Sequence, residues 1–377
     1  MHSDHLRRAR EQFRSIDDEA SSLGPDGAVA RSTLDRLVDA GLYGLMVPEA
    51  VGGQELPLAD LVDVYAELSR ADASTGWVHF ACDLTAAYFG AYLPDDGVAD
   101  VFADGVPFMA GQFAPNGTAV PSASTPDSWD LTGAYQFGSG IAISDWAGGG
   151  MLATTDGADA PDFLFGCFPT ASVELRGNWD VLGLRATASY DYVVDHVEVP
   201  ASHTFDFFAP TVRRGGPMYR LGILPLAAAS HAGWALGVTR RMLDELAAVA
   251  STVRMGATSS LADSDHFLIE YAELESRYLA GRAWVRQVLV DAEVAAADGR
   301  DDEPVPAAVA DLVRQACVHV NRGGAAIAER AYLLAGTRAL RDGVLQRCHR
   351  DLHAGSQHYF ASHAASVDFA RMLLAGS

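Results

Sequence analysis

The chain of 377 residues contains no lysine, so all 27 of its basic residues are arginine. This absence excludes Schiff-base catalysis, the anchoring of pyridoxal phosphate, and the lysine-dependent phosphate loop of nucleotide-binding proteins. Any anion that binds must therefore be held by arginine side chains, backbone N–H groups or helix N-termini.

Long apolar runs are also absent. Hydrophobic residues make up 49% of the chain, but none of their runs approaches the ~20 residues that a membrane span needs. The first 20 residues are charged and amphipathic, unlike the apolar stretch of a secretory signal. We therefore expect a cytoplasmic protein without a membrane partner.

Positive charge is scarce, and the formal net charge is −22. Because nucleic-acid binding depends on neutralising phosphates, such an acidic chain is a poor candidate for it. The four cysteines, Cys82, Cys167, Cys317 and Cys348, are widely spaced and form no CxxC pair, which argues against a disulfide framework and a zinc site.

The chain has no GxGxxG motif after a predicted strand. The run Gly148 to Gly150 lies in the wrong context, so a Rossmann-type nicotinamide site is not supported. If the protein uses reducing equivalents, we expect them to arrive on a cofactor that is reduced elsewhere.

Hydrophobic periodicity divides the chain into three parts. Residues 1–105 have helical spacing with short breaks, and residues 218–377 return to long helical stripes. Residues 106–217 instead contain short apolar segments separated by turn residues, a pattern typical of a small antiparallel barrel or sandwich. The sequence therefore predicts an α+β protein, mainly α, in the order helical domain, β domain, helical bundle.

Two segments carry a resemblance to a known family. Residues 179–200, WDVLGLRATASYDYVVDHVEVP, give a turn at 183–185 and then a strand of alternating polarity that ends at Pro200. The pair Arg350-Asp351 lies near the C-terminus. Both resemble the acyl-CoA dehydrogenase superfamily, in which the turn and strand lie beside a flavin. The resemblance implies an N-terminal helical domain, a middle β-barrel, a C-terminal four-helix bundle and a homotetramer.

The catalytic base of the dehydrogenases is missing. Those enzymes place a glutamate eight residues after the aspartate of that pair, because removing an α-proton from an acyl thioester requires a carboxylate. This chain has Tyr359 there, preceded by His358. Other members carry the carboxylate on the first bundle helix, where our alignment places Ala227. Neither position holds an acid.

In lacking this base, the chain resembles another branch of the superfamily, the two-component flavin-dependent monooxygenases. Three features carry the resemblance: His358, the segment Ser74-Thr75-Gly76-Trp77, and the pair Ser139-Gly140. It implies that reduced flavin, FAD or FMN, arrives from a separate reductase and reacts with O₂ to a C4a-hydroperoxide, which oxygenates a small aromatic or amine-bearing substrate. His358 would be the catalytic residue, stabilising the peroxide or taking a proton from the substrate.

The remaining site residues follow from the same resemblance. Ser139 and Gly140 would contact the flavin edge, and Arg254 would reach a diphosphate. Trp179 and Arg185 would pack on the flavin ring, or else Trp179 fills the barrel core and Arg185 pairs with a carboxylate. Residues expected to line the substrate pocket are Trp77, His79, Cys82, Thr85 and Tyr359.

Three alternatives stay open. His349 and His353 are spaced i, i+4 and could present two ligands to a metal ion, although no HExxH motif is present. The chain could be an acyl-CoA dehydrogenase or flavin oxidase with a relocated base, or a helical scaffold without catalytic activity. The identity of the substrate and the choice between FMN and FAD are not determined.

Overall fold

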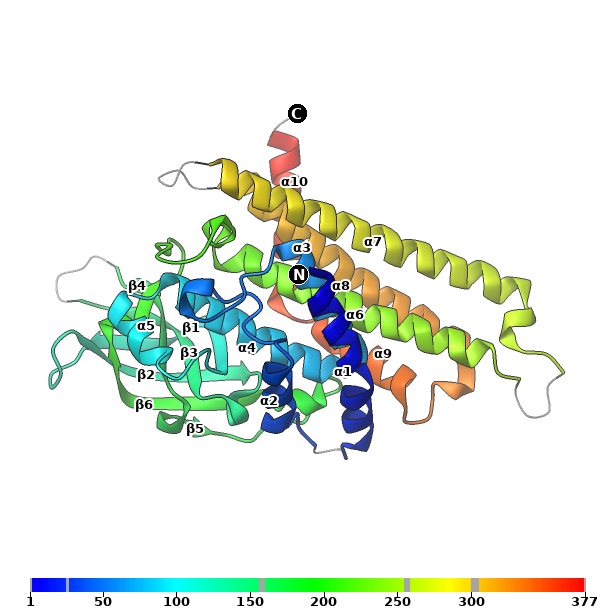
Figure 1. Ribbon diagram of the computed structural model, residues 1–377, viewed down its shortest axis with the longest axis horizontal. Helices are drawn as coiled ribbons and strands as arrows, with labels where there is room; N and C mark the ends of the chain where they lie inside the picture. The colour runs from blue at the N-terminus through cyan, green and yellow to red at the C-terminus, as the bar shows by residue number, and fades with distance from the viewer. Residues whose placement is uncertain (1, 25–26, 156–159, 254–257, 300–304, 376–377) are drawn as a thin grey trace.

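A computed structural model describes residues 2–24, 27–155, 160–253, 258–299 and 305–375. Helices come first, a β-sheet follows, and long helices return, so the predicted α, β, α order is confirmed (Figure 1). The predicted domain boundaries at 105 and 217 stay predictions. They fall close to the start of β1 at Met109 and to the 3₁₀ helix that begins at Pro217.

The helices before the sheet are α1 (His2–Ser22), α2 (Arg31–Asp39), α3 (Leu58–Ala71), α4 (Ala73–Tyr92) and α5 (Asp95–Val101). Helix α4 is the central one, because nearly all its residues are buried and it packs against β1 on one side and bundle helices on the other. Asp72 caps α4 by accepting a hydrogen bond of 2.8 Å from the Thr75 N–H. This helix therefore connects the sheet to the bundle.

The strands are β1 (Met109–Pro121), β2 (Ser128–Gly138), β3 (Trp146–Ala153), β4 (Asp162–Pro169), β5 (Glu174–Leu175), β6 (Tyr190–Pro200) and β7 (Thr204–Asp206). Their order in the sheet is β5-β6-β2-β1-β3-β4-β7. The expectation of a purely antiparallel arrangement was wrong in one place, because β1 and β3 pair in parallel. Alternating polarity shows which side chains share a face but not which way the neighbouring strand runs.

The inner face of the sheet is closed by two tyrosines. Tyr135 on β2 and Tyr192 on β6 stack with ring centroids 4.9 Å apart. Their hydroxyls donate to the carbonyls of Gly150 and Gly148 on β3, across the inside of the curved sheet. Because both hydroxyls are hydrogen bonded, the desolvation of their polar ends is offset and these large side chains can fill the sheet's core.

The helices after the sheet are α6 (Ile223–Ala250), α7 (Asp265–Asp298), α8 (Ala307–Ala335), α9 (Val344–Gly355) and α10 (His363–Ala375). Helix α6 lies at the centre of this bundle and also packs on α3 and α4. Trp234 of α6 is fully buried and donates its Nε1–H to the carbonyl of Ala73 at the start of α4. The bundle is thereby fixed to the central helix.

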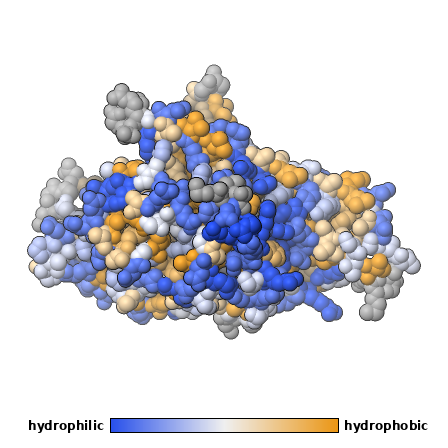
Figure 2. All heavy atoms as spheres, in the orientation of Figure 1, coloured by the Kyte–Doolittle hydropathy of each residue, from blue (hydrophilic) through white to orange (hydrophobic). Residues whose placement is uncertain are grey.

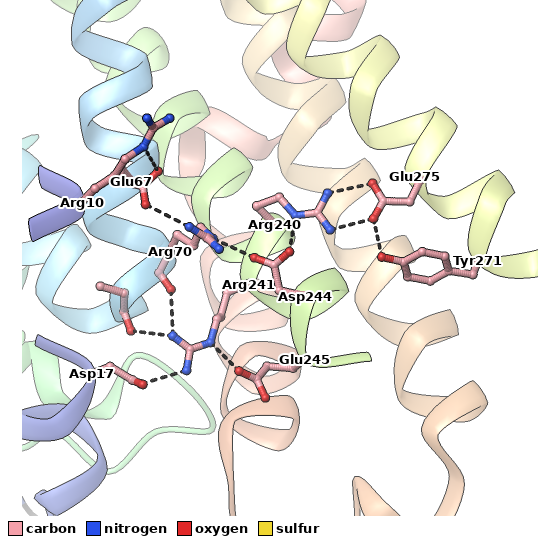
Figure 3. Close-up of polar contacts among 11 residues, drawn as sticks. Arg10, Asp17, Glu67, Arg70, Arg240, Arg241, Asp244, Glu245, Tyr271 and Glu275 are labelled. Carbon is pink, nitrogen blue, oxygen red and sulfur yellow. Dashed lines mark hydrogen bonds and ion pairs between the residues drawn. The ribbon is translucent and has the colours of Figure 1, made fainter. Parts of the chain in front are cut away.

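A network of arginines joins α1, α3, α6 and α7 (Figure 3). Arg240 makes a two-pronged contact with Glu275 of α7, and Arg70 of α3 reaches Asp244 of α6 at 2.7 Å. Arg241 pairs with Asp17 of α1 at 2.9 Å. We call Arg70, Arg240, Arg241 and their carboxylate partners the arginine network. It uses the planar fork of arginine in a chain that has no lysine.

The surface carries exposed apolar side chains on α7 and α10. Leu279 and Val294 of α7 are 57% and 54% exposed, and Leu374 of α10 is 77% exposed. Figure 2 shows hydrophilic side chains at the centre of one face, where α1 lies, and hydrophobic groups toward its ends. Every helix in the described part of the chain is too short or too polar to cross a bilayer.

Candidate functional site

A directed chain of hydrogen bonds links α4 to the end of β2. Trp77 Nε1–H donates to Ser139 Oγ at 3.0 Å, Ser139 and Ser189 hydroxyls lie 2.8 Å apart, and Ser189 and Thr187 hydroxyls 2.7 Å apart. Thr187 donates its only hydroxyl hydrogen to the Leu184 carbonyl. It follows that Ser189 donates to Thr187 and Ser139 donates to Ser189. All the hydroxyl hydrogens are used, but each serine retains a free lone pair.

The turn before β6 is held against α9. A Cβ on Gly183 would lie 2.2 Å from the carbonyl oxygen of Arg350, so only glycine allows this approach. The next residue, Leu184, has a left-handed backbone (φ 56°), and its N–H donates to Asp351 Oδ1 at 2.6 Å. The two segments that carried the family resemblance, residues 183–185 and 350–351, are therefore in direct contact.

His358 lies in a group of aromatic rings contributed by α4, α6 and the 3₁₀ turn Tyr359–Ala361. Its Nδ1 accepts the Phe360 N–H at 3.4 Å, which caps that turn. Its ring stacks on His231 of α6, with centroids 4.3 Å apart, and meets Trp77 edge-on at 5.5 Å. We call this group the aromatic box. Its members are Trp77, Phe80, His231, Trp234, His358 and Phe360.

Both imidazoles of the box are held neutral. Burial lowers the pKa of His358 to about 4. Burial, and secondarily the positive charge that His358 would carry, lowers the pKa of His231 well below its usual value. The site therefore presents two uncharged imidazoles at neutral pH, each able to donate one hydrogen bond and accept another.

The positions where the dehydrogenases keep their base hold no acid here. Ala227 is fully buried on α6, and its carbonyl accepts a hydrogen bond from His231 Nδ1 at 2.8 Å. Tyr359 is 57% exposed and touches Phe360. The buried carboxyl groups of Asp72 and Asp351 are used to cap α4 and to hold Leu184.

Several predicted residues share one face of α4. A Cβ on Gly140 would contact Val78 and Cys82, and a Cβ on Gly111 of β1 would contact Thr85. Cys82 and Thr85 are both buried. The structure therefore places Gly140, Cys82 and Thr85 where α4 meets the sheet. Cys82 and Thr85 lie on the same helix as Trp77, which donates to Ser139.

His79 lies elsewhere on the same helix. It is fully buried, hydrogen bonds the carbonyl of Leu42, and meets Tyr43 and Tyr65 edge-on. These contacts belong to the core of the N-terminal helices, not to the aromatic box. The expectation that His79 lines a substrate pocket is therefore not favoured by its position.

The remaining predicted residues lie near the turn or outside the described residues. Trp179 donates to the Leu184 carbonyl at 3.0 Å. Arg185 lines a cavity of about 340 Å³, between the turn and α9, that Arg347, Arg350 and Asp351 also line. Arg254 falls outside the described residues.

Two residues were missed by sequence reasoning. His231 is a single histidine in an alanine-rich helix, and only its contact with His358, 127 positions along the chain, gives it meaning. Phe137 is 62% exposed and has a left-handed backbone (φ 63°), which is rare for a bulky residue and is concentrated at functional sites. A sequence shows neither backbone strain nor exposure.

The histidines considered for a metal lie together on α9. The rings of His349 and His353 are 4.5 Å apart, and Tyr332 stacks on His349. Among the described residues, however, no group of three or more potential ligands comes together. Two imidazoles alone leave a zinc ion short of its usual four ligands.

The arrangement beside the hydroxyl chain fits a flat heteroaromatic cofactor. Phe137 and Trp179 meet edge-on at 6.1 Å and offer an apolar wall. Trp179 and Thr187 both donate to the Leu184 carbonyl, so this wall adjoins the hydroxyl chain, in which Ser139 offers an oxygen lone pair. A ring system with polar edges can stack on such a wall and hydrogen bond at its rim.

Comparison with known proteins gives matches over most of the chain. Residues 6–92 match the family described as acyl-CoA dehydrogenase, N-terminal domain, and residues 229–363 match acyl-CoA dehydrogenase, C-terminal domain. Indole-3-acetate monooxygenase of Pseudomonas putida is 28% identical over 345 residues, which are 88% of this chain and 84% of that protein.

Two solved structures have the same fold. XiaF from Streptomyces sp., in complex with FADH2 and glycerol, superposes with a TM-score of 0.89 at 19% identity, over 99% of this chain and 96% of its own. TdsC from Paenibacillus sp. A11-2, in complex with FMN and indole, gives a TM-score of 0.84 at 19% identity, over 99% of this chain and 97% of its own. The predicted fold is confirmed by these neighbours.

Proposed function

Because this chain belongs to the acyl-CoA dehydrogenase superfamily, we propose that it is the oxygenase component of a two-component flavin-dependent monooxygenase. The observation that carries the proposal is a neutral imidazole, His358, packed among aromatic rings, while Ala227 and Tyr359 stand where the dehydrogenases have their base. Without a carboxylate the site cannot remove the α-proton of an acyl thioester.

The chemistry supplied by a bound reduced flavin, FADH2 or FMNH2, is the transfer of electrons to O₂. Ser139 and Ser189 would hold its polar edge with their free lone pairs, and Phe137 and Trp179 would hold its plane. XiaF and TdsC are complexes with FADH2 and FMN respectively, so both flavins occur within this fold.

The aromatic box excludes water and keeps a hydrogen-bonding group inside an apolar wall. Trp77 and Phe360 cover His358, while the cap to Phe360 N–H fixes its ring. In such a dry site a neutral imidazole hydrogen bonds strongly to an oxygen atom or to a substrate O–H or N–H. The substrate that suits these rings is a small aromatic compound, as in indole-3-acetate monooxygenase and in the indole complex of TdsC.

The partners follow from this assignment. A separate reductase would supply the reduced flavin, in the cytoplasm where NAD(P)H is available. We further propose a homotetramer, for which the exposed leucines and valines of α7 and α10 provide apolar contact area.

The proposal is tested by supplying a flavin reductase, NAD(P)H, FAD or FMN, and indole in air. We expect oxygenated product only when all components are present. In His358→Ala, flavin binding should persist while product formed per O₂ consumed falls, by a factor of roughly 10². Unchanged coupling in this variant would remove His358 from the mechanism.

The dehydrogenase alternative makes an opposite prediction. An acyl-CoA dehydrogenase with a relocated base would be purified with tightly bound FAD, and an acyl-CoA would bleach that flavin without oxygen. Anaerobic titration with butyryl-CoA and octanoyl-CoA distinguishes the two enzymes, and bleaching would contradict the monooxygenase proposal. Failure to bind flavin in either redox state would indicate a scaffold without catalytic activity.

A further inference from the structure

Two histidines, not one, are built into the aromatic box. His231 of α6 and His358 stack face to face, with an angle of 28° between their planes. Phe360 packs on both rings, at 5.0 and 5.4 Å, and Trp77 meets both edge-on. Because each imidazole is contacted on several sides, neither ring can turn over without repacking the box.

The backbone fixes a different tautomer on each ring. His231 Nδ1 lies 2.8 Å from the Ala227 carbonyl, which can only accept, so this nitrogen carries the hydrogen. His358 Nδ1 accepts the Phe360 N–H, so this nitrogen carries the lone pair. A neutral imidazole has one N–H. The Nε2 of His231 is therefore a hydrogen-bond acceptor, and the Nε2 of His358 is a donor.

The elements around the pair keep it uncharged. Three side chains packed on it, Trp77, Phe80 and Phe360, are uncharged aromatics. Protonation of either ring would place a cation in this apolar surrounding, and a second proton would set two cations 4.3 Å apart. The pair is therefore suited to share hydrogen bonds with a neutral molecule rather than to bind an anion.

We propose that His231 and His358 act as an acceptor–donor pair that selects the substrate. His231 Nε2 accepts a hydrogen bond from the ring N–H or O–H of a neutral aromatic substrate, and His358 Nε2–H donates to an oxygen atom in the same site. The role of the oxygen acceptor rests on the proposed monooxygenase function. The pairing of tautomers and the preference for a donor-bearing ring do not.

The tautomers can be measured without flavin or turnover. In the purified protein labelled with ¹⁵N-histidine, long-range ¹H–¹⁵N spectra distinguish a protonated Nδ1 from a protonated Nε2, and single His→Gln variants assign the signals. We expect a protonated Nδ1 on His231 and a protonated Nε2 on His358 at neutral pH. The same tautomer on both rings would overturn the proposal, whether or not the protein is an oxygenase.

Selectivity is tested with indole and 1-methylindole, in which a methyl group replaces the N–H hydrogen and removes the donor. Binding to the flavin-free protein, followed by calorimetry, should favour indole by about ten-fold, the effect of one buried hydrogen bond. His231→Asn keeps a donor near Nδ1 for Ala227 but loses the acceptor at Nε2, so it should bind both compounds alike. His231→Gln places an amide oxygen near Nε2 and should restore the preference.

The control is His353→Asn on α9, a histidine whose ring meets His349 and not the box. It should bind like the wild type. Equal preference for indole in the wild type and His231→Asn would overturn the proposal, as would a wild type that binds neither compound or does not prefer indole. If the preference is present but reductase and NAD(P)H yield no product, the proposed function fails while the acceptor–donor pair stands.

Discussion

The arginine network and the aromatic box treat charge in opposite ways. In the network, Arg240 and Arg241 are matched with carboxylates in two-pronged or short contacts, at the junction of four helices (Figure 3). In the box, His231 and His358 are titratable but stay neutral, because their neighbours are aromatic rings. The first region uses formed charges to hold helices, while in the second the burial of two imidazoles among aromatic rings keeps them uncharged.

The turn at Gly183 and Leu184 contacts another buried titratable group, on α9. Burial raises the pKa of Asp351, which accepts the Leu184 N–H, to about 7. This carboxyl thus behaves like the histidines of the box, since burial favours its uncharged form, although Arg347 and Arg350 oppose the effect. The difference between the regions teaches that burial decides the charge state only where no arginine fork is in direct contact.

The largest effect is expected where the turn touches α9. In Gly183→Ala the new methyl group would lie 2.2 Å from the Arg350 carbonyl, so the turn must move away from the helix. We expect a loss of about 3 kcal/mol in the free energy of unfolding. Urea denaturation measures it. Gly24→Ala, at a loop glycine with nothing within 4 Å of a Cβ, is the control and should be close to neutral. A small loss in Gly183→Ala would show that the contact is loose.

Much of the contact between α4, the end of β2 and the turn at residues 183–185 could be predicted from the sequence. Trp77, Ser139 and the 183–185 turn occur in recognisable motifs, and the structure brings them to one hydroxyl chain. The sequence does not show which side chains of α4 turn toward the sheet and the aromatic box, because almost every residue of this helix is buried and the helix has no polar side. For this reason the sequence predicts His79 in the substrate pocket, together with other residues of α4, whereas its contacts are with Leu42 and Tyr43 in the core of the N-terminal helices.

The partner of His358 could not be predicted for a different reason. His231 belongs to a helix whose pattern is simply apolar, and its neighbour is brought to it by the packing of α6 against the turn that follows α9. The parallel pairing of β1 with β3 is likewise a property of topology. Contacts between distant segments leave no local pattern in a chain.

The second prediction concerns the dependence of stability on pH. Because the pKa of Asp351 is raised in the folded state, its contribution is present at low pH and is lost as the pH rises toward 7. We expect wild-type unfolding free energy to fall by about 2 kcal/mol from this group between about pH 5 and pH 8. Asp351→Asn keeps an oxygen for the Leu184 N–H but cannot ionise, so this part of the loss should vanish. If the unfolding free energies of the wild type and Asp351→Asn change with pH in parallel, Asp351 is not the group responsible.

The smallest effect belongs to the charged region and should depend on salt. Arg240→Gln removes the two-pronged contact with Glu275 and the contact with Asp244, both partly buried, and should cost about 1 kcal/mol at low ionic strength. High salt should shrink this cost, because it weakens the ion pairs of the wild type. Arg277→Gln, whose i, i+4 pair with Glu273 is exposed, is the matched control and should change little in either condition. A cost for Arg240→Gln that does not respond to salt would mean that the guanidinium acts by packing over Tyr278, whose ring centroid lies 5.1 Å away, and not by charge.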